Sequence, residues 1–231
     1  MNRFIPLGAL CLAAVGGYAL WQAATPTPHA STTALPYGAA IAQETAKDAD
    51  AADIDTSSIV EMTMGPEDAA VTVTEYASFT CPHCATFHKG PLKKLKADYV
   101  QTGKVRFIYR DVYFDRYGLW ASMVARCGGQ DRFFGIAEMI YDQQRDWIGD
   151  QDPTGIIERL RKIAKVAGLS DEALDACLAD EDKARTLVAW YKEHSEADDI
   201  TSTPTLIIDG EKHSNMSYDE LRTIIDAKLG E

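Results

Sequence analysis

The chain carries little positive charge. Its 231 residues include 23 Lys and Arg residues against 35 Asp and Glu residues, which gives a net charge of −12 at pH 7. Nucleic acids and anionic membrane surfaces attract proteins mainly through clustered Lys and Arg. The composition therefore disfavours both as partners, and we interpret the acidic excess as a solubility feature. A hydrophobic fraction of 46% suffices for a globular core. The length predicts one domain, or one domain with an insertion.

Cysteine is also scarce, but two of the five cysteines form a CxxC tetrapeptide, Cys81-Pro82-His83-Cys84. Such a pair can be half of a structural zinc site, which needs two further ligands that usually form a second close-set pair. The sequence lacks that second pair, because the other cysteines lie far apart and the histidines show no paired spacing. The sequence thus predicts neither a metal site nor an organic cofactor. A redox pair, which carries electrons on its own sulfurs, is favoured instead.

The segments around the CxxC support a redox pair. Residues 71–79 are rich in β-branched and aromatic side chains, which predicts a strand. Phe87, Leu92, Leu95 and Tyr99 follow at helical spacing. The CxxC therefore opens a helix at the edge of a sheet. A purely structural short-loop disulfide is the alternative, and the strand–helix context disfavours it.

The start of a helix suits thiolate chemistry. The thiolate is the nucleophilic form of cysteine, and unpaired N–H groups and the helix dipole favour a negative sulfur there. Pro82 suits the first helical turn, and His83 can add positive charge or a hydrogen bond. We predict Cys81 as the attacking sulfur and Cys84 as the resolving sulfur. Once the pKa of Cys81 lies below ambient pH, each further pKa unit of lowering stabilises the reduced state by about 1.4 kcal/mol. On a two-electron couple this raises the reduction potential by roughly 30 mV.

The N-terminal 24 residues have the composition of a targeting segment. Arg3 is their only positively charged side chain, and residues 4–21 contain no charge. This predicts a signal peptide, and the length of the apolar run leaves an uncleaved membrane anchor open. Residues 25–57, rich in Ala, Thr, Pro and Asp, are predicted to form a flexible linker. The folded region is expected at residues 58–231.

Export bears on the remaining cysteines, because cysteines pair in oxidising compartments. With Cys11 in the targeting segment set aside, Cys127 and Cys177 remain. We predict a structural disulfide between them, with two separate buried thiols as the alternative. A loop of 50 residues would stabilise the fold by about 4 kcal/mol in the chain-entropy model.

The rest of the chain predicts an α/β fold. Residues 60–64 and 105–112 read as further strands, so that a βαβ unit surrounds the CxxC helix. Apolar stripes at helical spacing run from about residue 117 to 197. Thr203-Pro204 precedes a last predicted strand, and this position suggests a cis peptide in a tight turn. Ser217 and Glu220 form a capping box for a final helix.

Together, these features resemble the DsbA family of bacterial periplasmic thiol–disulfide oxidoreductases. The resemblance covers roughly residues 58–231 and depends on the CxxC with Pro-His inside it, the flanking strands, the helical stretch and Thr203-Pro204. It implies a thioredoxin-like fold with a helical domain inserted at about 117–197. It also implies that Cys81 accepts the substrate thiol, that Cys84 resolves, and that the backbone at Thr203 and Pro204 binds substrate peptide.

The resemblance assigns one acidic residue as well. Glu75 lies six residues before Cys81, where the family has a buried acid that helps proton movement at the resolving cysteine. Alternation along the strand gives Glu75 the same face as Val71 and Val73, which favours burial. His88, by contrast, is expected on the helix surface.

The resemblance leaves the direction of electron flow open. The best-known oxidases of the family have Val where this chain has Thr203, and Thr is common there in reductases, isomerases and some DsbA-like branches. The expected function is a monomeric dithiol oxidase that introduces disulfides into reduced, exported proteins in the periplasm, with reoxidation by a membrane DsbB-type, quinone-linked partner. A reductase or isomerase is the first alternative, and a chaperone without redox activity is the second.

Overall fold

A computed structural model describes residues 54–231. The expected signal peptide or anchor, and the expected linker up to residue 53, lie outside the described residues. None of the described helices combines the length and the apolar character that a membrane span requires.

A five-stranded sheet forms the centre of the described domain, with the order β1-β3-β2-β4-β5. Strands β2 and β3 run parallel, and the other neighbours are antiparallel. The parallel pair with its helical crossover confirms the predicted βαβ unit. The strands are β1 (Met62–Met64), β2 (Val71–Ala77), β3 (Val105–Asp111), β4 (Thr205–Ile208) and β5 (Glu211–Ser214).

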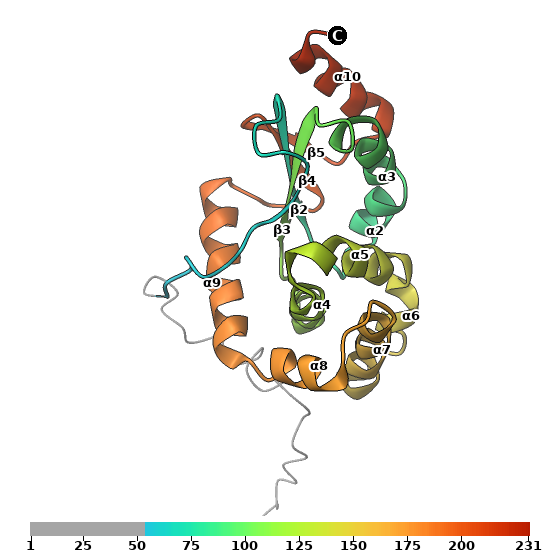
Figure 1. The fold of residues 1–231 in the computed structure, drawn as a ribbon. Coiled ribbons are helices and arrows are strands. Elements are labelled where there is room, and N and C mark those ends of the chain that lie inside the picture. The colour runs from blue at the N-terminus through green and yellow to red at the C-terminus, as the bar shows by residue number, and fades with distance from the viewer. Residues whose placement is uncertain (1–53) are drawn as a thin grey trace, which may run out of the picture. The chain divides into compact units, whose positions relative to one another are not determined.

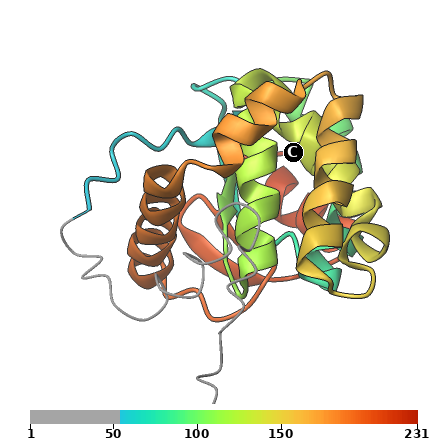
Figure 2. The same cartoon turned by 90° about the horizontal axis from the view of Figure 1, so that it is seen from below.

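Helices cover both faces of the sheet. Figure 1 shows α2, α3 and α10 on one side of the strands and α9 on the other, while α4 to α8 gather beyond one end of the sheet. The view from below agrees, with α4 between α9 and α7 (Figure 2). The helices are α2 (Pro82–Lys89), α3 (Pro91–Leu95), the π-helical turn η2 (Lys96–Val100), α4 (Arg116–Cys127), α5 (Gly129–Asp142), α6 (Gln144–Ile148), α7 (Pro153–Val166), α8 (Asp171–Leu178), α9 (Glu181–Ala197) and α10 (Tyr218–Leu229).

Strand β2 is the central strand, and its two faces serve different layers. Val71, Val73 and Glu75 alternate onto the face that α2 covers, and all three are buried. Tyr76 points to the opposite face, where its hydroxyl donates a hydrogen bond to Asp198 Oδ2 at 2.5 Å, just after α9. Because β2 lies between β3 and β4, its carboxyl end places the CxxC at the middle of the sheet edge.

The helical segment between β3 and β4 extends from Arg116, at the start of α4, to Ala197, at the end of α9. Asp152 and Ser170 are the N-caps of α7 and α8, because each side chain accepts a hydrogen bond from a backbone N–H of the first turn. A disulfide joins Cys127 at the end of α4 to Cys177 in α8, with 5.9 Å between the Cα atoms. It ties together the first and fifth helices of the segment.

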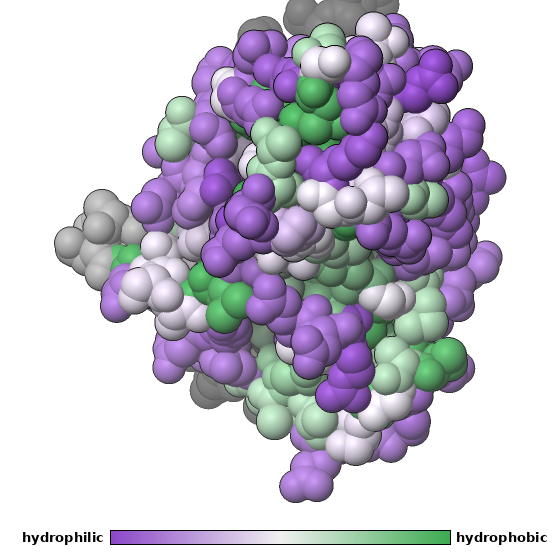
Figure 3. Space-filling view, turned by 45° about the horizontal axis from the view of Figure 1, so that its top comes forward, coloured by the Kyte–Doolittle hydropathy of each residue, from purple (hydrophilic) through white to green (hydrophobic). Residues whose placement is uncertain are grey.

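Some boundaries differ from the expectation. The first strand covers residues 62–64 instead of 60–64, and Val60 is exposed. Strand β5 was not predicted, because Glu211–Ser214 is a short polar edge strand without apolar alternation. The surface is largely hydrophilic in the view of Figure 3, with hydrophobic residues in small groups between polar ones. Among the described residues, the exposed large hydrophobic side chains are Val60, Phe114 and Val166.

Candidate redox site

Cys81 lies where β2 gives way to α2. It is the N-cap residue of α2, with extended backbone angles (φ −80°, ψ 120°), and Pro82 occupies the first helical position. The Cys81 side chain is 8% exposed and Cys84 is 0% exposed, and neither forms a disulfide in this structure. The outer sulfur is therefore the one that a second molecule can reach.

The two sulfurs differ strongly in acidity. The pKa of Cys81 is lowered to about 5, and the largest cause is a hydrogen bond that the Cys84 thiol donates to the Cys81 sulfur. Burial of Cys81 acts in the opposite direction and raises its pKa. The Thr203 hydroxyl and the backbone N–H groups of Cys84 and His83 lower that pKa further. Burial raises the pKa of Cys84 far above its ordinary value, and the Cys81 sulfur and Glu75 add to this effect. The site thus combines a thiolate at Cys81 with a neutral thiol at Cys84.

A cis peptide faces this pair. The Thr203-Pro204 bond is cis, and the Thr203 carbonyl oxygen lies 3.5 Å from Cys81 Sγ. Strand β4 brings the turn there, because Thr205 pairs with Tyr76 next to the CxxC loop. The buried Thr203 hydroxyl oxygen has no competing hydrogen-bond partner within 54–231, so its hydrogen is available to the charged sulfur of Cys81.

His83 lies in the first turn of α2 with its side chain exposed. Within the described part of the chain, its ring forms no hydrogen bond with Cys81, and its backbone N–H is the group that favours the thiolate. An exposed imidazole at this point can contact a bound protein as well as the sulfur.

Glu75 lies under the site and pairs with a residue that the sequence pattern placed elsewhere. Glu75 is 0% exposed, and its Oε2 lies 2.9 Å from Nε2 of His88. The expectation that His88 occupies the helix surface was wrong: His88 is 5% exposed and stacks on Tyr141, with 3.9 Å between ring centroids. Periodicity could have indicated this, because His88 lies one turn after Cys84 on the buried face of α2.

Gln144 is a site residue that the sequence did not indicate. Its Nε2 donates hydrogen bonds to the carbonyl oxygens of Phe79 and Cys81, both at 2.8 Å, and the side chain is 5% exposed. Gln144 belongs to α6, so the helical segment directly holds the loop before the CxxC. No local pattern marks a glutamine 63 residues away as a partner of that loop.

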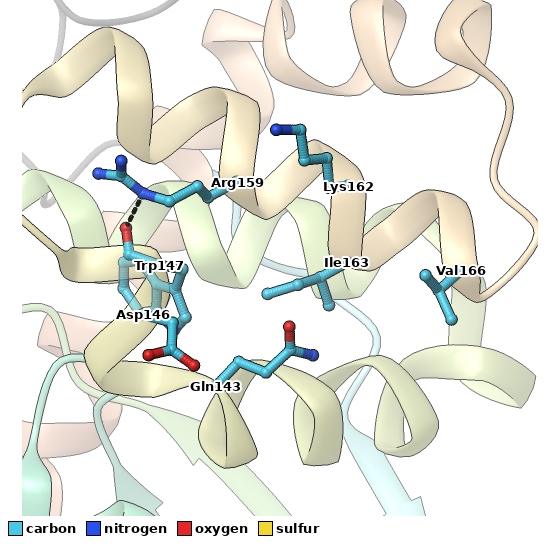
Figure 4. A pocket seen from close by; sticks show the side chains of 7 residues that line it. All are labelled: Gln143, Asp146, Trp147, Arg159, Lys162, Ile163 and Val166. Atoms are coloured by element: carbon cyan, nitrogen blue, oxygen red, sulfur yellow. Dashed lines mark hydrogen bonds between the residues drawn. The ribbon is translucent and has the colours of Figure 1, made fainter.

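One further cavity lies on the helical segment. It has a volume of about 170 Å³ and lies between α6 and α7, where Arg159 Nε donates to the Trp147 carbonyl oxygen at 2.9 Å (Figure 4). Neither cysteine of the CxxC nor the cis-proline turn lines it, so we do not assign it to the redox site. Within residues 54–231, no group of His, Cys, Asp and Glu side chains is arranged to hold a metal ion.

A strand, a CxxC at a helix start and a facing cis-proline together define a site of the thioredoxin type. The chain belongs to the thioredoxin family, whose model matches residues 57–227. Within that family its architecture is of the DsbA type. The crystal structure of Wolbachia pipientis alpha-DsbA1 superimposes with a TM-score of 0.69 and 26% identity, and it covers 74% of this chain and 91% of the other.

Two relatives agree in kind. A Rickettsia bellii protein with the name "Putative protein-disulfide oxidoreductase" is 30% identical over 172 residues, which cover 74% of this chain and 65% of the relative. Disulfide bond formation protein D of Bacillus subtilis is 26% identical over 171 residues, 72% of this chain and 76% of the relative. The chain thus spans slightly less than two thirds of the Rickettsia protein's length.

Proposed function

We propose that this protein is a thiol–disulfide oxidoreductase that introduces disulfide bonds into exported proteins through Cys81-Pro82-His83-Cys84. The observation that carries the proposal is the difference between the two sulfurs. A pKa of about 5 for Cys81 stabilises the reduced form at neutral pH, because the thiolate needs no proton. A stable reduced form makes the disulfide form a strong oxidant.

The reaction proceeds by two exchanges. A substrate thiolate attacks Sγ of Cys81 in the oxidised protein, and the bond between Cys81 and Cys84 breaks. Cys84 leaves with the electron pair and takes up a proton. The second substrate thiolate then attacks the substrate sulfur of the mixed disulfide, which releases Cys81 as a thiolate and leaves the substrate oxidised.

The surroundings of Cys81 support binding of an unfolded peptide. The carbonyl group of Thr203, in the cis-proline turn, lies beside the sulfur, where an extended peptide could form backbone hydrogen bonds as an added strand. Phe114 is 60% exposed and precedes Asp115, whose Oδ2 accepts a hydrogen bond from Thr80 next to the CxxC. An exposed apolar side chain next to a residue that bonds the CxxC loop suits substrates whose hydrophobic residues are not yet buried.

The names of the relatives and the predicted targeting segment support the rest of the proposal. We infer an exported, periplasmic, monomeric protein, cleaved or membrane-anchored at its N-terminus. Its electrons would pass to a membrane oxidase of the DsbB type. These assignments depend on the kinship with DsbA-type proteins and on the expectation for residues 1–24.

A disulfide reductase or isomerase is the second candidate, and Thr203 favours it. A hydroxyl at this position can hold the mixed disulfide longer by bonding its sulfur, which suits an enzyme that reshuffles bonds. A holdase that works without the sulfurs is a third candidate, and it requires that Cys81→Ser retain full function.

The redox equilibrium with glutathione separates these candidates. Purified protein is equilibrated in buffers of defined glutathione ratio, and the reduced fraction is read from tryptophan fluorescence. We expect a potential well above that of the glutathione couple. A potential near that of thioredoxin, about −270 mV, would reject the oxidase and favour the reductase or isomerase. Refolding of a reduced, disulfide-containing substrate by wild type and by Cys81→Ser tests the holdase.

A further inference from the structure

In the buried pair Glu75–His88, one carboxylate oxygen of Glu75 has a partner and the other has none within the described residues. Oε2 of Glu75 lies 2.9 Å from Nε2 of His88, which is a hydrogen-bond distance at which the two groups can share a proton. Oε1 of Glu75 is buried and has no partner in the described chain. A buried carboxylate oxygen without a donor is costly in a purely structural role, and this cost indicates a functional one.

Cys84 is the neighbour that the pair can serve. Cys84 and His88 lie one turn apart on the same face of α2, and Glu75 is close enough to raise the pKa of Cys84. The other titratable groups that face the pair are Tyr109 on β3 and Tyr141 on α5, whose hydroxyls bond each other at 2.7 Å. Burial raises the pKa of both tyrosines well above the ordinary range, so neither exchanges protons near neutral pH.

His88 also reaches a small cavity, whereas Glu75 does not. The cavity has a volume of about 10 Å³ and lies between the α2–α3 segment and α5. This is the space that about one water molecule needs. Its lining includes His88, Leu92, Phe134 and Ala137, and three charged side chains, those of Lys93, Lys96 and Glu138.

The charged side chains connect the cavity with solvent. Lys93 and Lys96 lie 3.1 Å and 3.3 Å from the carboxylate of Glu138, and all three are partly exposed. Neither Cys81 nor the cis-proline turn lines this cavity. A substrate bound over Cys81 would therefore not block access of protons from solvent to the buried pair through this cavity.

We propose that His88 is a positioning and proton-transfer residue that carries protons between solvent in this cavity and Glu75, and through Glu75 to Cys84. When substrate thiolate attacks Cys81, Cys84 leaves with the electron pair of the broken S–S bond. It takes the proton that Glu75 and His88 share, and water in the cavity returns a proton to His88. In the reverse direction Cys84 gives its proton to the pair as its sulfur attacks a mixed disulfide at Cys81.

This inference rests on the proposed function in one respect, because it requires thiol–disulfide exchange at Cys81 and Cys84. The direction of net electron flow does not matter to it. It is therefore tested on one step that an oxidase and a reductase share, the resolution of a mixed disulfide between Cys81 and glutathione by Cys84. Release of glutathione is followed by rapid mixing from pH 5 to pH 9 in wild type, His88→Gln, Glu75→Gln and the double variant.

His88→Gln keeps a donor toward Glu75 but cannot cycle a proton. We expect resolution to slow about a hundredfold, as general acid–base catalysis predicts, and its pH profile to differ from that of wild type. The double variant should be no slower than Glu75→Gln alone, because the two residues act in series. Wild-type rates and an unchanged pH profile in His88→Gln would overturn the proposal, as would additive losses in the double variant.

Two controls separate proton transfer from loss of structure. In a Cys84→Ala background, iodoacetamide should alkylate Cys81 at the same rate with and without His88→Gln, because that reaction needs no proton at Cys84. Ala137→Val keeps both polar groups and fills the cavity, so it should slow resolution in the same direction. Resolution at the wild-type rate in Ala137→Val would overturn the route through the cavity.

Discussion

The acidity of Cys81 should appear as a pH-dependent stability of the reduced protein. The pKa falls from an ordinary value of 9.0 to about 5 on folding. At pH 7 the Cys81 thiol is protonated in the unfolded protein and ionised in the folded protein. The stabilisation of the fold at this pH therefore corresponds to the distance from pH 7 to the folded pKa, about two units, which is about 2.7 kcal/mol. On a two-electron couple the same free energy corresponds to roughly 60 mV.

The sign of the effect follows from the lowered pKa. A group whose pKa is lower in the folded state stabilises the fold at high pH, and the stabilisation is lost as pH falls through about 5. Cys84 adds nothing in this window, because its pKa is raised and both states keep its proton. The free energy of unfolding of reduced wild type should therefore decline by about 2.7 kcal/mol between about pH 7 and pH 4 relative to Cys81→Ser.

The assay compares urea unfolding of reduced wild type and reduced Cys81→Ser at half-unit pH steps from 4 to 8. All other titrating groups are common to both proteins, so the difference between the two curves isolates Cys81. Oxidised wild type, which has no thiolate, is the control and should lack the extra slope. A difference that stays constant with pH, or thiolate absorbance at 240 nm with a midpoint near 9, would refute the reasoning.

Three other substitutions probe the scaffold. Replacing Cys127 and Cys177 together with Ala should lower the free energy of unfolding by about 4 kcal/mol and leave the redox potential unchanged; a loss below about 1 kcal/mol in denaturant unfolding would contradict this. Gln144→Leu leaves the carbonyl oxygen of Phe79 without its Gln144 donor, at a cost of about 1–3 kcal/mol, while the carbonyl oxygen of Cys81 keeps its hydrogen bond from the Ala85 N–H. The substitution should also change the thiolate titration of Cys81, and an unchanged titration would mean that α6 does not position the loop. Ser217→Ala removes a capping box and should cost about 1 kcal/mol in thermal unfolding without any effect on thiol exchange; a neutral substitution would show that the helix end is not stabilised by the box.

Local patterns predicted the parts of the fold that short-range physics decides. The β-branched and aromatic side chains of residues 71–79 indicated β2, and the capping box at Ser217 marked a helix start that the structure has. Each of these signals lies within about four residues of what it specifies. Strand β5 lacks such a signal, since its polar residues pair only with the edge of β4.

The parts of the site that were missed depend on contacts across the fold. Gln144 reaches the CxxC loop only because α6 packs at the end of the sheet, and His88 is buried only because α5 covers that face of α2 with Tyr141. A histidine among lysines in a helix resembles a surface residue when the helix is considered alone. Its burial could be inferred only by combining the one-turn spacing to Cys84 with the inward face of Glu75.

The unequal sulfurs follow from their places within one helical turn. Cys81, at the N-cap, meets backbone N–H groups and the Cys84 thiol, while Cys84 faces inward toward a buried carboxyl group. A thiolate of low pKa is a good leaving group and a weak nucleophile. Mixed disulfides at Cys81 should therefore break readily toward the free Cys81 thiolate, which releases oxidised substrate. The same acidity should slow attack by Cys81 on other disulfides, and both effects suit the dithiol oxidase that we propose.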